Sequence, residues 1–317
     1  CLNADEPNIP EKTPNKLKFL RLNGSYVNYE PKFTASDNKW YNKLEKYWKP
    51  SENNALKSFN NFLKNGAENY SDGRNYPSRK NVSRISAYLH WGQISPRKLW
   101  YDAKQFMKED NKETFLNELA WREFSYHLLY YFPDINKSNL KSQFNHLEWN
   151  DDSDLFEKWK KGQTGYPIVD AGMRELWQTG YMHNRARMIT ASFLVKNLLI
   201  NWKQGERWFW DCLVDADLAS NSASWQWVAG TGSDAAPFFR IFNPITQSLK
   251  FDKDAKYIRK YVPEIAQLPD KLIFTPWLID RIILEKYKIV LGKDYPFPIV
   301  DYALSRKAAL EAFKRIN

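Results

Sequence analysis

We expect an all-α protein from this sequence, for three reasons. Apolar residues recur with helical spacing in several separate segments, no long stretch alternates apolar and polar residues as a half-buried strand does, and Gly or Pro interrupts the helical segments. The chain has 317 residues, of which 43% are hydrophobic and 16% aromatic, enough to bury a large core. The expected architecture is a multi-helix bundle, and the composition excludes a disordered chain.

The expected helices follow one another from Lys39 onward. Apolar residues keep helical spacing from Lys39 until Gly66, and the strongest helix is expected over Phe115–Phe132, where Pro133 ends it. Residues 70–83 and 133–165 are expected to be irregular. Short helices are expected around Ile85 and before Pro96, and further helices over 168–179 (closed by Gly180), 183–202 (broken at Gly205), 208–213, 257–261, 277–287 and 303–316.

Two regions are expected from the composition. Residues 1–39 are rich in Pro, Asn and Lys and predict a connector, whereas residues 40–317 predict one helical domain. No run of about 18 apolar residues predicts a transmembrane helix. The two cysteines, Cys1 and Cys212, allow no disulfide framework, and no cluster of His and Cys predicts a metal site. We therefore expect a protein without metal in the reducing cytoplasm.

The charge balance suggests a polyanionic partner. Lys and Arg number 47 against 37 Asp and Glu, which gives a formal charge of +10. Nucleic acid or an anionic membrane would suit this surplus, but a general drift toward Lys and Asn explains it as well. The 14 Trp residues beside arginines fit a site that stacks on planar rings, although each Trp alone is better explained as core.

Two helical segments group chemically distinct side chains on one face. Glu118 and Arg122 share a face with Trp121, which combines a carboxylate, a guanidinium and a stacking surface; a surface ion pair beside a core Trp is the alternative. Likewise Asn184 and Arg187 share a face with Met188, while Arg185 points elsewhere. An Arg on an otherwise apolar helix needs a carboxylate if it is buried, and a solvated Arg is the alternative.

Carboxylates for such an arginine occur in the segment from Asp215 to Asn221. Asp215 and Asp217 are followed by small residues that allow a ligand to approach closely, although a plain capping loop would look the same. A calcium site is disfavoured because further oxygen ligands are lacking. Ser83–Ser86 forms a hydroxyl-bearing loop that enters a helix, which is a weak signal for phosphate binding.

Taken in order, these segments resemble the helical, flavin-binding half of the cryptochrome/photolyase family. The likeness extends from about residue 40 to the end of the chain. It rests on the strings Ser83–Leu89, Trp121–Phe124, Gly165–Arg174, Thr179–Met188, Trp225–Pro244 and Tyr295–Asp301.

The resemblance implies a bound FAD in a bent conformation and light-driven electron transfer from the reduced flavin to a cyclobutane pyrimidine dimer in DNA. Transferred position by position, it implies that FAD is held by Tyr70, Val82, Ser83, Arg84, Ile85, Ser86, Phe115, Glu118, Arg122, Asn184, Arg187, Asp215, Ala216, Asp217 and Asn221. Arg187 would pair with Asp215, Asp217 would accept from the ring N–H, and Asn221 would face the flavin N5.

The same resemblance implies a pocket for a lesion that has left the duplex. Trp121 and Trp227 would form its flat walls, Met188 an adaptable apolar contact, and Glu118 a hydrogen bond to the pyrimidine edge. Burial is expected to favour a protonated Glu118 if it must donate. Arg74, Arg185 and Arg240 would hold phosphates, and a relay for flavin reduction would run through Trp225, Trp202 and Trp149. UV-damaged DNA is thus the expected partner of a monomeric, nucleoid-associated enzyme.

The branch of the family is inferred from single positions. Asn221 and Met188 favour a class I cyclobutane pyrimidine dimer photolyase over a cryptochrome, which remains the alternative, and a flavin-free nucleic-acid-binding protein is a third reading. Val82, Ala87 and Phe115 depart from the family's usual Thr, Pro and Trp. The N-terminal α/β antenna domain is expected to be missing, so no antenna chromophore is expected on this chain.

Overall fold

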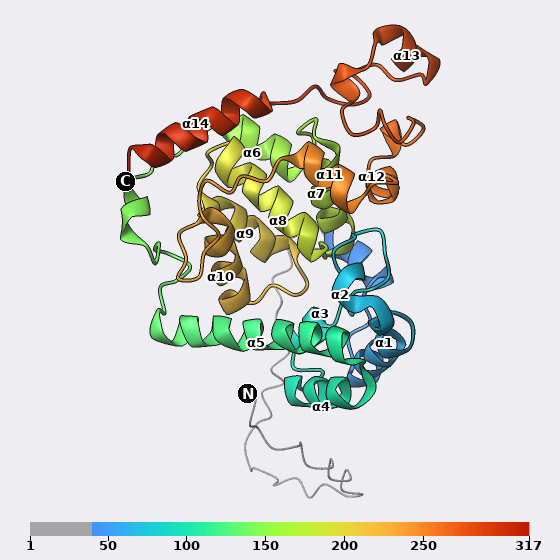
Figure 1. The fold of residues 1–317 in the computed structure, drawn as a ribbon, viewed down its shortest axis with the longest axis vertical. Coiled ribbons are helices and arrows are strands. Elements are labelled where there is room, and N and C mark those ends of the chain that lie inside the picture. The colour runs from blue at the N-terminus through green and yellow to red at the C-terminus, as the bar shows by residue number, and fades with distance from the viewer. Residues whose placement is uncertain (1–39, 317) are drawn as a thin grey trace, which may run out of the picture.

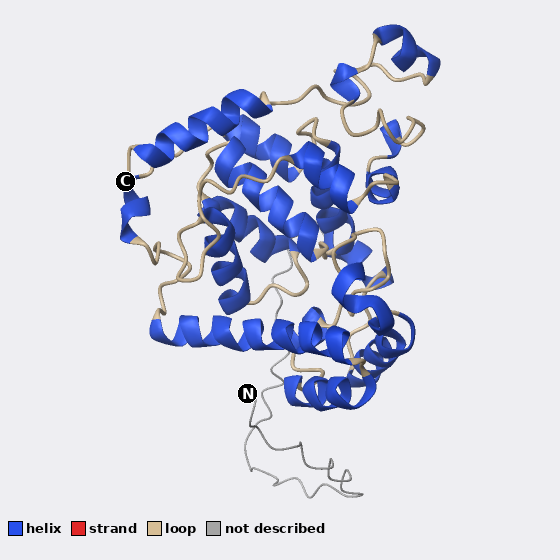
Figure 2. Cartoon of the chain, viewed as in Figure 1, coloured by secondary structure: helices blue, strands red, loops and turns tan. Residues whose placement is uncertain are grey.

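The computed structural model describes residues 40–316 and is built from helices (Figures 1 and 2). Within residues 40–316 no strand forms, and a single isolated bridge pairs Leu291 with Tyr295. The expected all-α fold is therefore confirmed. The connector expected over residues 1–39 lies outside the described residues.

The helices are named as in Figure 1. They are α1 (Glu52–Asn65), α2 (Tyr70–Gly73), α3 (Ser86–His90), α4 (Pro96–Phe106), α5 (Glu109–Tyr131), α6 (Ser153–Lys160), α7 (Pro167–Thr179), α8 (Asn184–Ser192), α9 (Trp202–Cys212), α10 (Leu218–Ala229), α11 (Pro244–Phe251), α12 (Lys256–Tyr261), α13 (Arg281–Lys286) and α14 (Tyr302–Lys314). A π-helical turn, η4 (Phe193–Asn197), continues α8, and a 3₁₀ turn (Trp40–Lys46) precedes α1.

Several expected boundaries were wrong. The irregular stretches 70–83 and 133–165 contain α2 and α6, and the helix expected over 183–202 ends with η4, before a separate helix begins at Trp202. Helix α10 was not expected at all, although its ends carry clear signals. Asp217 caps its first turn by accepting from Ser220 N at 2.8 Å, and Gly230 ends it in the left-handed conformation (φ 90°).

Gly205 was expected to break a helix, and this was also wrong. It lies inside α9, where α9 crosses α10, and a Cβ at this position would lie 2.2 Å from the Trp225 ring. Glycine is therefore present because it lets the two helices approach, not because the helix ends there. The close crossing lets Trp225 of α10 pack directly against α9.

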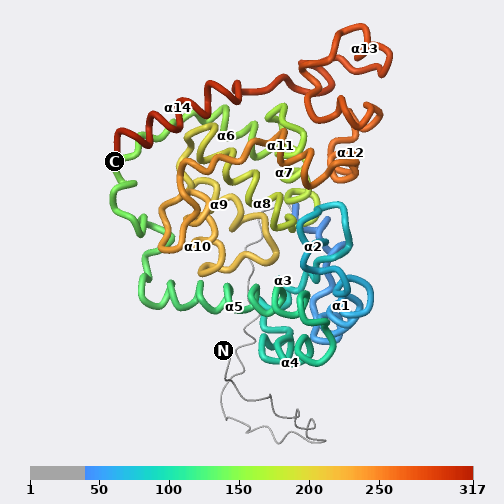
Figure 3. The backbone as a smooth tube through the Cα atoms, in the orientation of Figure 1, coloured from blue at the N-terminus to red at the C-terminus, as the bar shows by residue number. Residues whose placement is uncertain are grey.

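Two apolar clusters make up most of the interior. One joins α1–α4 to the first half of α5 through residues such as Phe59 and Phe115, and the other surrounds α7–α10. Helix α5 extends from the first cluster to α10, and Figure 3 shows its course between α4 and α10. Helix α5 therefore connects the first cluster to α10, which belongs to the second.

Buried carboxylates on α7 tie distant segments to this frame. Glu175 accepts from Tyr257 Oη (2.6 Å) and from the backbone N–H of His183 (3.0 Å), and burial raises its pKa. Asp170 accepts from Thr164 N (2.7 Å) and Tyr295 Oη (2.6 Å). Glu175 thereby fixes the start of α8, which carries four of the expected site residues, Asn184, Arg185, Arg187 and Met188.

In the part of the chain that the structure describes, no helix combines the length and apolar character needed to cross a membrane.

Replacing Gly205 with Ala is expected to destabilise the protein by about 1–3 kcal/mol, because the added methyl group overpacks the contact with Trp225. Urea unfolding followed by circular dichroism measures this change. Gln204→Ala, one residue away in α9, is the control and is expected to have little effect. Equal stability of Gly205→Ala and the wild type would contradict the packing role of Gly205.

Candidate functional site

A cavity of about 560 Å³ opens where α5 faces α8 and α10, within the size range of small-molecule sites. Most residues that the sequence assigned to flavin or DNA line this one cavity. They are Tyr70, Arg74, Val82, Ser83, Arg84, Ile85, Ser86, Phe115, Glu118, Trp121, Arg122, Asn184, Arg187, Met188, Asp215, Ala216, Asp217, Asn221, Trp225 and Trp227.

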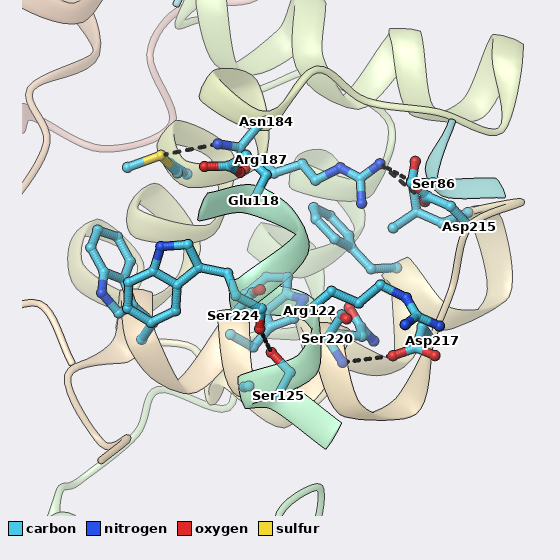
Figure 4. A pocket seen from close by; sticks show the side chains of 18 of the residues that line it. Ser86, Glu118, Arg122, Ser125, Asn184, Arg187, Asp215, Asp217, Ser220 and Ser224 are labelled. Atoms are coloured by element: carbon cyan, nitrogen blue, oxygen red, sulfur yellow. Dashed lines mark hydrogen bonds and ion pairs between the residues drawn. The ribbon is translucent and has the colours of Figure 1, made fainter. Parts of the chain in front are cut away.

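The wall of the cavity holds a paired arginine and aspartate (Figure 4). Arg187 Nη2 lies 2.8 Å from Asp215 Oδ2 and 3.0 Å from Oδ1, and Ser86 Oγ donates to Asp215 Oδ2 at 2.6 Å. Burial opposes the charge on Arg187, but the Asp215 carboxylate outweighs it and raises the pKa of the guanidinium. The expected pair is confirmed, and it keeps a permanent cation in the wall.

Asp217 supplies an ionised carboxylate on the same side. Burial works to raise its pKa, but hydrogen bonds from Tyr126 Oη and Ser220 N lower it. His90 Nδ1 also lies 3.5 Å from Asp217 Oδ2. Neither Tyr126 nor His90 was predicted. Tyr126 follows Arg122 by four residues and accepts from it at 3.4 Å, so the helical spacing could have indicated it.

The amide of Asn221 has a fixed orientation. Its Nδ2 donates to the backbone oxygen and to Oε1 of Glu206, both at 3.1 Å, so its carbonyl oxygen Oδ1 is left to face a ligand. Ser222 Oγ also donates to Glu206 Oε1, and burial raises the pKa of Glu206. Glu206 was not predicted, because its partners Asn221 and Ser222 lie on another helix, α10.

Glu118 is paired with a cation, contrary to expectation. Its Oε1 lies 2.6 Å from Arg74 Nη1, and 39% of its side chain is exposed. The burial expected for Glu118 is therefore wrong, and its carboxylate oxygens offer hydrogen-bond acceptors at the cavity.

Arg185 and Arg240 do not line the cavity but lie near its arginines. Burial lowers the pKa of Arg185, and the positive charges of Arg74 and Arg240 lower it further. The guanidinium of Arg185 also lies over the Phe251 ring at 4.2 Å and donates to Asn75. Three arginines that repel one another create a local positive field of the kind that attracts phosphates.

The three tryptophans expected to form a relay occupy different depths. Trp225 lines the cavity, Trp202 is fully buried and donates to Asn139 Oδ1 at 2.8 Å, and Trp149 is partly buried. The aromatic rings that lie beside Trp225 are those of Phe209 and Trp159, with ring centroids 4.9 Å and 6.3 Å from that of Trp225. The relay itself stays a prediction.

The cavity wall fits a flat anionic cofactor. The guanidinium of Arg84 lies over the Tyr181 ring, 4.6 Å from its centroid, yet its buried Nε and Nη2 donate to no atom of residues 40–316. Buried guanidinium nitrogens without partners point to an anionic ligand such as a pyrophosphate. Apolar residues, among them Phe209 and Leu213, line the cavity beside the charged groups and suit a planar ring. No cluster of metal-binding side chains occurs among residues 40–316.

Comparison with known proteins identifies the family. Residues 115–315 match the FAD binding domain of DNA photolyase. The deoxyribodipyrimidine photo-lyase of Agrobacterium fabrum is 44% identical over 99% of this chain and 66% of its own length. The chain belongs to the photolyase/cryptochrome family, and it carries that family's FAD-binding domain.

Solved structures support the fold and span two branches of the family. A bacterial class III photolyase from Agrobacterium tumefaciens superposes with a TM-score of 0.91 at 43% identity, covering 99% of this chain and 66% of that one. A Synechocystis cryptochrome superposes with a TM-score of 0.78 at 34% identity, covering 84% of this chain and 56% of that one. The chain thus spans between half and two thirds of its relatives' length. The matches support the family but do not single out the class I branch.

Replacing Asp215 with Asn is expected to cost about 3 kcal/mol of stability, near the lower end for breaking a buried ion pair, because 26% of the Arg187 side chain is exposed. Thermal unfolding measures the change, and the 450 nm absorbance of the purified protein measures retained flavin, which is expected to fall. Glu285→Gln, which breaks the exposed pair with Arg281, is the control. Unchanged stability and flavin content in Asp215→Asn would contradict the role of the pair.

Proposed function

We propose that the chain binds FAD in this cavity and uses light to split cyclobutane pyrimidine dimers in DNA. The observation that carries the proposal is the joint placement, around one cavity, of a charged cofactor wall (Arg187 and Asp215) and of an exposed indole and a partly buried guanidinium (Trp121 and Arg74). The photo-lyase relatives support it. Residues 40–317 would be the catalytic domain.

The chain's own groups have distinct tasks toward the cofactor. When bound, reduced FAD would supply on excitation the electron that opens the dimer, and the electron would return to the flavin once the cyclobutane bonds have broken. Arg84 and Ser83 would hold its pyrophosphate, because Arg84 has free donors. The cation of Arg187 would stabilise negative charge on the ring, and Asp217 would accept from a ring N–H. Asn221 would present Oδ1 toward the ring without adding a charge.

A second set of residues would receive the damaged bases. Trp121 is 49% exposed at the cavity, and Trp227 on α10 lines the same cavity. A dimer turned out of the duplex could therefore stack on their indole rings. Glu118 would accept a hydrogen bond from a pyrimidine N–H. Arg74 and Arg185, together with Arg240, would neutralise phosphates beside the lesion.

A cryptochrome without repair activity is the second candidate. The Synechocystis cryptochrome and the Arabidopsis cryptochrome-2, which is 38% identical, favour it. Asn221 and Met188 favour repair.

The proposal is tested with the protein loaded with FAD, reduced chemically, and illuminated with blue light in the presence of a DNA oligonucleotide that holds one thymine dimer. Chromatography of the oligonucleotide measures the dimer. We expect dimer loss in light and none in the dark. A protein that holds FAD but leaves the dimer intact in light would contradict repair and favour the cryptochrome alternative.

Glu118→Ala in the same assay is expected to lower the yield of repair per absorbed photon severalfold while flavin stays bound, because a hydrogen-bond acceptor is lost. Glu118→Gln retains an acceptor oxygen and is expected to lose less. An unchanged yield in both variants would remove Glu118 from the lesion site.

Trp225→Phe is expected to block light-driven reduction of oxidised FAD, because phenylalanine is much harder to oxidise than the indole that lines the cavity. Repair by chemically reduced protein is expected to persist. Absorbance at 450 nm under blue light with an added reductant follows the reduction. Trp202→Phe is the companion variant. Normal photoreduction in Trp225→Phe would exclude Trp225 from the relay.

A further inference from the structure

A lysine, Lys196, lies fully buried in η4, the π-helical turn that ends α8. Lys196 is 1% exposed, and its Nζ donates to the backbone oxygen of Arg240 at 3.1 Å. The ring of Phe238 lies 5.5 Å from the same ammonium.

Keeping a lysine here is costly. Burial, and then the positive charge of Arg240, lower the pKa of Lys196 to about 7. In the described part of the chain no carboxylate pairs with its Nζ, so the ammonium gains no ion pair in return. An apolar side chain of similar length would fill the same space without this desolvation. The lysine therefore calls for an explanation other than packing.

The lysine holds one particular segment, the loop of residues 231–243 that follows α10. The start of this loop, at Gly232, lines the cavity, Phe238 is buried in a small aromatic cluster, and Arg240 is exposed. Ser192 adds a second tie, because its Oγ accepts from Phe242 N at 3.3 Å. Ser192 at the end of α8 and Lys196 in η4 thus hydrogen-bond to the loop backbone on both sides of residue 241.

The same helix carries Arg185 at its beginning, so it determines how far Arg240 lies from the other arginines. The charge of Arg240 lowers the pKa of both Arg185 and Lys196. Without the tie to Lys196, this mutual repulsion would favour movement of Arg240 away from the cavity. The buried ammonium opposes that movement by fixing the Arg240 carbonyl.

We propose that Lys196 is a positioning residue that holds the Arg240 guanidinium beside the cavity, near Arg185, where it would contact a DNA phosphate. This inference rests on the proposed function, because it takes damaged DNA as the ligand. It assigns Lys196 no contact with DNA or cofactor.

A double-mutant cycle in the full chain with FAD bound tests the proposal. Lys196→Met, Arg240→Ala and the double variant are titrated with a fluorescent duplex containing one thymine dimer, in the dark, at several salt concentrations. We expect Lys196→Met to weaken binding on the order of tenfold and to reduce the salt slope by about one, as loss of one phosphate contact does. The double variant should bind like Arg240→Ala alone.

Asn197→Leu is the matched control. Asn197 neighbours Lys196 in the same turn but donates to Ser305 Oγ (2.9 Å) in α14, away from the loop, so this variant should bind DNA normally. Flavin absorbance and melting temperature show which variants are folded. If Lys196→Met does not fold, Ser192→Ala replaces it in the cycle, with a smaller loss of the same kind expected.

The outcomes separate the inference from the proposed function. Unchanged DNA affinity in Lys196→Met, or an equal loss in the presence and absence of the Arg240 side chain, would overturn the positioning role. The cycle reads binding alone, so it still decides the role of Lys196 if the wild type binds the lesion without repairing it. A wild type that binds no damaged DNA would overturn both.

Discussion

The ion pair between Arg187 and Asp215 is the interaction on which the rest of the site depends. It joins the first turns of α8 to the segment before α10, and Ser86 adds the start of α3 to the same carboxylate. Three segments far apart in the chain therefore meet at one buried charge pair. Since breaking such a pair leaves an uncompensated charge in the protein interior, the pair fixes both the shape and the sign of the cavity wall.

Around this pair the fold uses buried carboxylates to orient other groups. Glu206 turns the Asn221 amide so that its oxygen faces the cavity, and Glu175 holds the backbone at the start of α8. The two carboxylates face the protein and each accepts several hydrogen bonds, so a ligand meets only the groups that they position. The site is thus prepared before a ligand arrives, which reduces the ordering cost of binding.

The spacing of residues along the sequence predicted the features that depend on neighbours within one helix. The helical spacing of Glu118 and Arg122 placed them on one face. The need of a buried arginine for a carboxylate indicated Asp215 or Asp217 as a partner for Arg187, and the resemblance to the family implied Asp215. What depends on tertiary contacts was not predictable. Gly205 looked like a helix break because its reason, the Trp225 ring, is twenty residues away. Glu206, His90 and the Arg74–Glu118 pair were missed or misjudged for the same reason, since their partners come from other helices.

We infer that one cavity holds the flavin and receives the flipped dimer. A crystal structure of the chain with FAD and a duplex containing a thymine dimer is the decisive test. We expect the flavin ring against Arg187, Asp215 and Asn221, with the dimer out of the duplex against Trp121. A flavin bound elsewhere, or a dimer left stacked in the duplex beside an empty cavity, would contradict it.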